Sequence, residues 1–203
     1  MKRILMIFVV CCMVLPNPVH ADMIIDTGEP PDVDGGTVLD VSQWLAGEFT
    51  LTEAYTITDV LGWMNYDTPG DVTVVIYGDG GDVPDGSELY SYTSDLSLVL
   101  PSDRHNAWAG AQGVSWNLGP GTYWAAFEVS EIEPEYAMPT PAPSPLDNYA
   151  FTMDSTWHNE HTDFGIRIYG VPVVPVPAAF ILGIIGLGSA GLGLRRRSVK
   201  QVS

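Results

Sequence analysis

The chain has 203 residues, of which 46% are hydrophobic, and its 25 acidic against eight basic residues give a formal net charge of −17. This charge repels phosphate backbones and anionic lipid headgroups, which excludes nucleic acid and peripheral membrane surfaces as partners. The hydrophobic and aromatic content excludes a wholly disordered chain.

Residues 1–21 have the three parts of a secretory signal peptide. Lys2 and Arg3 form a positive start, residues 4–15 are apolar, and small residues stand at Val19 and Ala21. We therefore expect export and cleavage after Ala21.

The two cysteines, Cys11 and Cys12, lie inside this leader. Lipidation there is the alternative, but it requires a small residue directly before the cysteine, and Val10 stands in that place. Cleavage after Ala21 leaves a mature chain without a disulfide, a Cys-metal site or a Cys nucleophile.

Residues 22–170 have the size of one domain with its own core. All 25 acids lie in this segment, and Arg104 and Arg167 are its two basic residues, which gives a net charge of −23. Such a surface keeps the domain soluble and could attract divalent cations.

The pattern within this segment predicts β-structure throughout. Residues alternate with period 2 most clearly at 72–77, 123–129 and 164–169, and more weakly at 37–41, 47–52, 55–64, 88–94 and 113–118. Turns rich in Gly, Pro and Asp separate them. Eight or nine short strands predict an all-β, antiparallel, jelly-roll-like sandwich.

The proline run at 139–145 is expected to be a stiff loop inside this domain, because too few residues follow it to form another core.

Two clusters of polar residues could hold a metal ion. Asp79, Asp82, Asp85 and Glu88 supply four carboxylates on a glycine-rich turn, as Ca²⁺ requires, although without EF-hand spacing. A solvated hairpin is the alternative to a calcium site at this turn.

The segment 158–163 holds two histidines and two acids, with a polar turn as the alternative to a transition-metal site. No other cofactor is expected.

The tryptophans at 44, 63, 108, 116, 124 and 157 could form an aromatic platform for sugar rings or could belong to the core. No Gly-x-Ser-x-Gly, phosphate loop or dinucleotide motif is present, and no pair of acids is singled out for hydrolysis. We therefore expect no enzymatic activity and no catalytic residue.

The C-terminal segment predicts a membrane anchor. From Val176, 19 residues pass without a charge, which as a helix would span about 28 Å, close to the thickness of a bilayer core. Arg195, Arg196 and Arg197 follow and would remain in the cytoplasm. We expect a proline-rich linker at 171–177, a transmembrane helix with its basic stop at 178–197, and a short tail at 198–203.

This tail resembles the PEP-CTERM sorting signals, which combine a proline motif, a glycine-rich apolar helix and a basic cluster. The proline motif is Val174-Pro175-Val176-Pro177-Ala178, similar to the related Val-Pro-Leu-Pro-Ala tails. The resemblance implies a bacterial envelope protein whose tail is recognised by an exosortase-like processing enzyme at the inner membrane. The segments 43–51, 55–60, 75–79, 84–86, 121–124 and 164–170 also resemble the sandwich ectodomains that precede such tails, which implies a fold and a location but no activity.

Together these features predict an exported, non-enzymatic protein, anchored in the inner membrane before processing and then placed at the cell surface or in the extracellular matrix. The first alternative is a glycan-binding module that holds an extracellular polysaccharide, and the second is an envelope hydrolase.

Overall fold

The computed structural model describes residues 20–31, 36–65, 69–96, 106–130, 136–160 and 162–173. These residues form strands and no helix, which confirms the all-β prediction. The strands are β1 (Asp22–Asp26), β2 (Thr37–Leu39), β3 (Leu45–Leu51), β4 (Tyr55–Asn65), β5 (Asp71–Asp79), β6 (Pro84–Asp95), β7 (Asn106–Leu118), β8 (Gly121–Glu128), β9 (Tyr136–Met138), β10 (Tyr149–Met153), β11 (Thr156–Glu160) and β12 (Ile166–Pro172).

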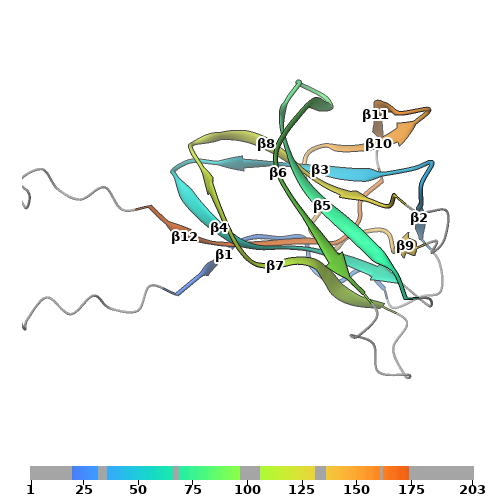
Figure 1. The fold of residues 1–203 in the computed structure, drawn as a ribbon, viewed down its shortest axis with the longest axis horizontal. Helices are drawn as coiled ribbons and strands as arrows, with labels where there is room; N and C mark the ends of the chain where they lie inside the picture. The colour runs from blue at the N-terminus through green and yellow to red at the C-terminus, as the bar shows by residue number, and fades with distance from the viewer. Residues whose placement is uncertain are drawn as a thin grey trace, which may run out of the picture. The chain divides into compact units, whose positions relative to one another are not determined.

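The strands form two six-stranded sheets, and every pairing within them is antiparallel, as expected for a sandwich. Sheet I has the order β1-β12-β4-β9-β2, and β7 pairs with the other edge of β4. Sheet II has the order β11-β10-β3-β8-β5-β6. Figure 1 shows the strands of the two sheets crossing one another as two layers.

Five of the pairings are nested within one another along the chain: β1 with β12, β2 with β9, β3 with β8, β4 with β7, and β5 with β6. From β2–β9 inward, successive pairs alternate between sheet I and sheet II, as in a long double-stranded ribbon that folds over itself. The two ends of the described domain therefore meet, with Asp22 opposite Gly170.

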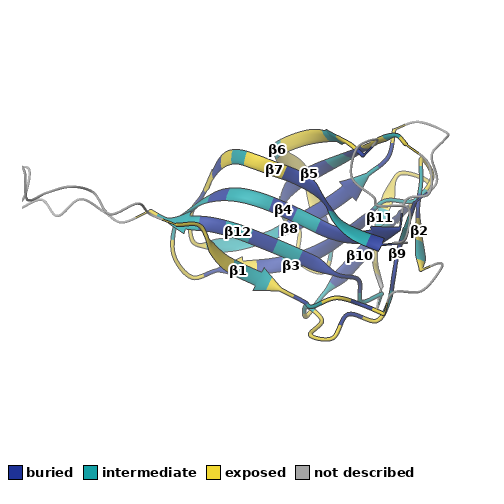
Figure 2. Cartoon of the chain, turned by 90° about the horizontal axis from the view of Figure 1, so that it is seen from below, coloured by how far each residue is buried: buried dark blue, intermediate teal, exposed yellow. Residues whose placement is uncertain are grey.

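The main core lies between the sheets and follows from the period-2 alternation of side chains. In β5, Val72, Val74 and Ile76 are fully buried, and they pack with residues of sheet I such as Ile57 and Ile168. The largest fully buried apolar side chains are Trp124, Tyr136, Phe127, Phe164, Leu39, Leu45, Ile57, Met64, Ile76, Met138, Ile166 and Ile168. Figure 2 shows buried positions along the strands of both layers, while β6 is mostly exposed.

A second, smaller cluster covers the other face of sheet II. Its buried members come from positions that alternate with those of the main core: Ala46, Val75, Tyr77, Trp124, Ala126 and Ala150. Trp157 of β11 and Val83 of the β5–β6 loop pack against it. The hairpin β10–β11 thus contributes to covering the centre of sheet II, which explains why both faces of β5 are apolar.

The proline run packs against the domain through backbone hydrogen bonds. The amide of Ala142 donates to the carbonyl oxygen of Asp163 at 2.8 Å, and that of Ser144 donates to the carbonyl oxygen of Thr27 at 2.8 Å. These bonds fix the run beside both ends of the domain, so it does not separate two folding units.

The structure contains strands that the sequence did not predict, namely β1, β9, β10 and β11. In addition, β7 begins at Asn106, whereas only 113–118 was predicted. Its first half holds Ala107, Ala109 and Ala111, which have low strand propensity, and it is a strand because β4 pairs with its full length.

Replacing Phe164 tests the core. Its ring packs edge-on against Phe127 and Tyr149, with centroid distances of 6.3 and 4.9 Å. Phe164→Ala should lower the free energy of unfolding of a 22–173 domain by about 3–5 kcal/mol, because it leaves a cavity between the sheets. Urea denaturation measures this loss. The exposed Met23→Ala is the control and should change stability by less than about 0.5 kcal/mol; equal effects of the two would contradict this core.

Candidate functional site

The predicted residues of export and sorting lie at or beyond the edges of the described domain. Ala21 is exposed and directly precedes β1. The sorting motif at 174–178, the apolar run at 178–194 and the arginines at 195–197 lie outside the described residues. In the part of the chain that the structure describes, no helix is long and apolar enough to span a membrane.

The four acids of the predicted calcium loop lie on and between β5 and β6. The carboxylate of Asp79 accepts from the Gly81 amide at 2.8 Å, and that of Asp85 accepts from the Ser87 amide at 2.7 Å. Glu88 accepts from the hydroxyl of Ser91. Three of the four carboxylates, those of Asp79, Asp85 and Glu88, thus bond to neighbouring residues of this hairpin. No group of three His, Cys, Asp or Glu side chains that could hold a metal was found among the described residues.

Calcium titration distinguishes the two interpretations of this loop. We expect millimolar Ca²⁺ to leave the melting temperature of the 22–173 domain unchanged, because Asp79 and Asp85 are engaged with separate backbone amides. Differential scanning fluorimetry with Mg²⁺ as the control measures this. A rise specific to Ca²⁺ that disappears in Asp79→Asn/Asp82→Asn/Asp85→Asn would establish the calcium site instead.

The predicted histidine cluster is only partly within the described residues. The ring of His158 packs against Phe151, with 5.6 Å between the ring centroids. Asn159 donates its side-chain amide to the carbonyl oxygen of Asp82 at 3.0 Å, which ties β11 to the β5–β6 loop. His161 lies outside the described residues, so the transition-metal site stays a hypothesis.

The six tryptophans do not form one platform. Trp63, Trp116 and Trp124 are buried. Trp44, Trp108 and Trp157 are half-buried and belong to different places: the turn directly before β3, the sheet I strand β7, and β11. Any aromatic sugar contact must therefore involve a single tryptophan with its own surroundings.

A cation of the same chain lies over the ring of the half-buried Trp108. The guanidinium carbon of Arg167 lies 4.1 Å from the centroid of its ring, and the Trp108 indole donates to Glu29 at 3.1 Å. Arg167 also pairs with Asp26 at 3.0 Å and with Glu29 at 3.6 Å. This arrangement clamps β7, β12 and the end of β1 together and leaves the ring little freedom to bind a ligand.

A carboxyl–phenol pair lies on the outer side of sheet II. The Tyr77 hydroxyl donates to Glu128 at 2.7 Å. Burial raises the pKa of the Glu128 carboxyl, the Tyr77 hydrogen bond lowers it in part, and the charge of Glu88 raises it. Burial, together with the bond to Glu128, also raises the pKa of the Tyr77 phenol. The pair stabilises the contact of β5 with β8.

The raised pKa of Glu128 has a measurable consequence. A carboxyl with a raised folded pKa contributes its full stability below the ordinary value of 4.5 and loses it as the pH rises through the folded pKa. Glu128→Gln can still accept the Tyr77 hydroxyl without charge, so its Tm should match the parent below pH 4.5 and exceed it at pH 7.

Thermal melts from pH 4 to 8 measure this difference. The matched control is Glu53→Gln, because Glu53 accepts from the exposed Tyr55 hydroxyl at 3.0 Å. A Glu128→Gln difference that is constant with pH would contradict the burial of this carboxyl.

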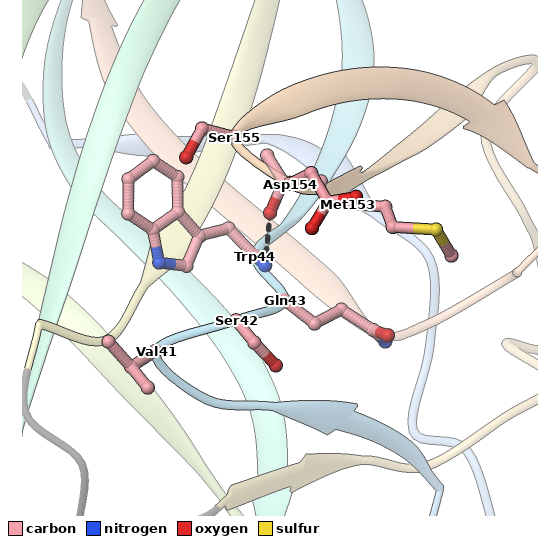
Figure 3. Close-up of a pocket in the computed structure, with 8 residues that line it drawn as sticks. Val41, Ser42, Gln43, Trp44, Met153, Asp154 and Ser155 are labelled. Atoms are coloured by element: carbon pink, nitrogen blue, oxygen red, sulfur yellow. Dashed lines mark hydrogen bonds between the residues drawn. The ribbon is translucent and has the colours of Figure 1, made fainter.

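The candidate ligand site is a cavity of about 380 Å³ between two tight turns. One turn leads from β2 to β3 and the other joins β10 to β11. The lining residues are Val41, Ser42, Gln43, Trp44, Thr152, Met153, Asp154 and Ser155. Figure 3 shows the Trp44 indole between Val41 and Ser155, with Asp154 and Met153 following along the same hairpin.

Hydrogen bonds hold the first turn in shape. One carboxylate oxygen of Asp40 accepts from the Ser42 amide, the Ser42 hydroxyl and the Gln43 amide at 2.7–2.9 Å. Burial raises the pKa of Asp40, but the three bonds outweigh it, so the pKa lies below its ordinary value. Asp40 is therefore committed to the turn and stays ionised near neutral pH.

The second turn has an unusual backbone. Asp154 and Ser155 have φ values of 52° and 61°, and they are the only non-glycine residues with positive φ in the described part of the chain. This conformation suits a two-residue hairpin turn, where Asn and Gly are preferred. Sequence reasoning missed the pocket because it assigned neither β10 nor β11; the Asp-Ser pair between two short β-prone runs was the available signal.

Comparison of the sequence with protein-family models and with curated proteins found no match in either. Function is therefore inferred from the residues and their geometry.

Proposed function

We propose that this chain is an exported, non-enzymatic envelope protein whose jelly-roll-like ectodomain is delivered to the cell surface or matrix by its C-terminal tail. The tail serves first as an inner-membrane anchor and then as the substrate of an exosortase-like enzyme, on the pattern of PEP-CTERM signals. The signal peptide directs the export that this route requires.

The observation that carries the proposal is the order of features after residue 170. A proline motif, an uncharged run of 19 residues from Val176, and three consecutive arginines follow one another directly. The prolines keep a helix from extending toward the domain, and the arginines oppose transfer through the bilayer. The extended motif then faces the processing enzyme with unpaired amides.

The limits of the described domain support this division of the chain. β1 begins at Asp22, the first residue after the proposed cleavage, and β12 ends at Pro172, before the sorting motif. All twelve strands lie between these residues. Removal of either terminal segment therefore takes none of the described strands out of a sheet.

The engagement of the acids supports a non-enzymatic role. Asp40, Asp79 and Asp85 bond to backbone amides of their own turns, and Asp26 pairs with Arg167. An envelope hydrolase, the second alternative, would require a free pair of carboxyls in a cleft. A panel of glycoside and ester substrates tests that alternative.

Truncation in cells tests the proposal. Deleting residues 174–203 preserves β12 and should release a soluble domain with an unchanged Tm while surface retention falls at least tenfold. Fractionation followed by immunoblotting and thermal melts measures both quantities.

The matched control deletes only residues 198–203, behind the arginines, and should retain the protein at the envelope. Continued retention of the 174–203 deletion, or its failure to fold, would contradict a tail that acts as a separable anchor.

A further inference from the structure

We propose that the cavity between the Asp40–Trp44 turn and the β10–β11 turn binds one unit of a neutral polysaccharide, with the sugar ring against Trp44. This inference goes beyond envelope display, which requires no ligand. It selects one place for the glycan-binding alternative, since the other half-buried tryptophans are engaged: Trp108 with Arg167, and Trp157 edge-on with Tyr77.

The cavity combines an aromatic ring with apolar sides that face solvent. Val41 is 45% exposed and Met153 is 56% exposed, and both line the cavity beside the half-buried Trp44. Sugar rings present a C–H face that packs on such surfaces, while their hydroxyls need hydrogen-bonding groups at the edge. A volume of about 380 Å³ suits a small ligand such as one or two sugar units.

Hydrogen bonds hold both the backbone and the ring of Trp44 in place before any ligand arrives. The backbone amide of Trp44 donates to the Thr152 hydroxyl at 2.7 Å, the bond drawn in Figure 3, and its backbone carbonyl oxygen accepts from the Thr152 amide at 2.9 Å. The indole nitrogen donates to the carbonyl oxygen of Val129 at 3.0 Å. A fixed ring loses little entropy on binding, which favours recognition.

The polar edge comes from Asp154 and Ser155. Neither side chain makes a hydrogen bond within the described part of the chain, and both line the cavity. Glycine would fit their positive φ without strain, whereas these residues cost stability there. A ligand that contacts the free hydrogen-bonding groups of Asp154 and Ser155 would explain why these residues, and not glycine, stand in a strained turn.

The charge of the surroundings selects a neutral sugar. Asp154 and the nearby Asp40 are acidic, and the one Lys or Arg among the described residues, Arg167, is paired with Asp26 and Glu29 in sheet I. No described cation is therefore available to bind a uronate or a sulfate. A single unit should bind weakly, with a Kd in about the millimolar range, so retention depends on many units of a polymer.

The test uses the 22–173 domain, which contains both sheets and both apolar clusters. The probes are pentasaccharides of glucose, mannose, xylose and N-acetylglucosamine, with oligogalacturonate as the acidic probe. The Trp44 indole signal, assigned with Trp44→Phe, is followed by ¹H–¹⁵N NMR during titration. At least one neutral probe should shift this signal in a saturable way, and oligogalacturonate should leave it unchanged.

Asp154→Gly/Ser155→Gly removes the polar edge and suits the backbone of the turn. It should weaken binding at least tenfold while the Tm stays equal to or above that of the parent. The control is Gln112→Ala, an exposed residue of sheet I, which should bind as the parent does. The proposal is overturned if no neutral probe shifts Trp44, if the acidic probe binds better, or if the double glycine variant binds as tightly as the parent.

Discussion

A fully buried threonine, Thr27, joins the two ends of this domain. Its amide donates to the carbonyl oxygen of Ile166 at 3.1 Å, and its hydroxyl accepts from the amide of Ile166 at 2.7 Å. Its own carbonyl oxygen accepts from Ser144 in the proline run. Burial of these groups away from water would be costly without such partners, so the three segments must come together. The pairing of β1 with β12 and the position of the proline run both follow from this junction.

The pairing of the two ends of the domain is compatible with the proposed removal of a leader and of a tail. In sheet I, β12 pairs with β1 on one edge and with β4 on the other, so all the described partners of β12 lie between Asp22 and Pro172. The proposed leader and sorting tail can then be recognised by separate machinery. The two turns that line the proposed sugar site, before β3 and after β10, lie apart from this junction in the sequence.

The parts of the fold that could be predicted from the sequence were those with strong side-chain patterns. β5, β8 and β12 carry apolar residues at period 2, and the solid apolar character of β5 follows from clusters on both faces of sheet II. The first half of β7 could not be recognised, because Ala107, Ala109 and Ala111 become strand residues only through pairing with β4. The short β10 likewise depends on a partner that is distant in sequence, β3, in which Leu45 pairs with Phe151, and β11 in turn pairs with β10.

The same distinction applies to the candidate site. In the sequence, Trp44 is one of six tryptophans with nothing to single it out. Its neighbours Asp154 and Ser155 lie more than one hundred residues away and join it only through the pairing of β10 with β3. The acids of the β5–β6 hairpin lie close together in the sequence, which suggested a calcium site, yet Asp79 and Asp85 accept hydrogen bonds from backbone amides of the same hairpin. Proximity in sequence was thus a poor guide to which groups remain free for a ligand.

Hydrogen exchange in the 22–173 domain tests most directly the central claim that the ends of the domain close it. The amides of Thr27 and Ile166 should exchange only through global unfolding, as slowly as the most protected amides of the central strand β4. The result that would contradict this claim is exchange of the Thr27 and Ile166 amides at rates near those of exposed loop amides while the β4 amides stay protected.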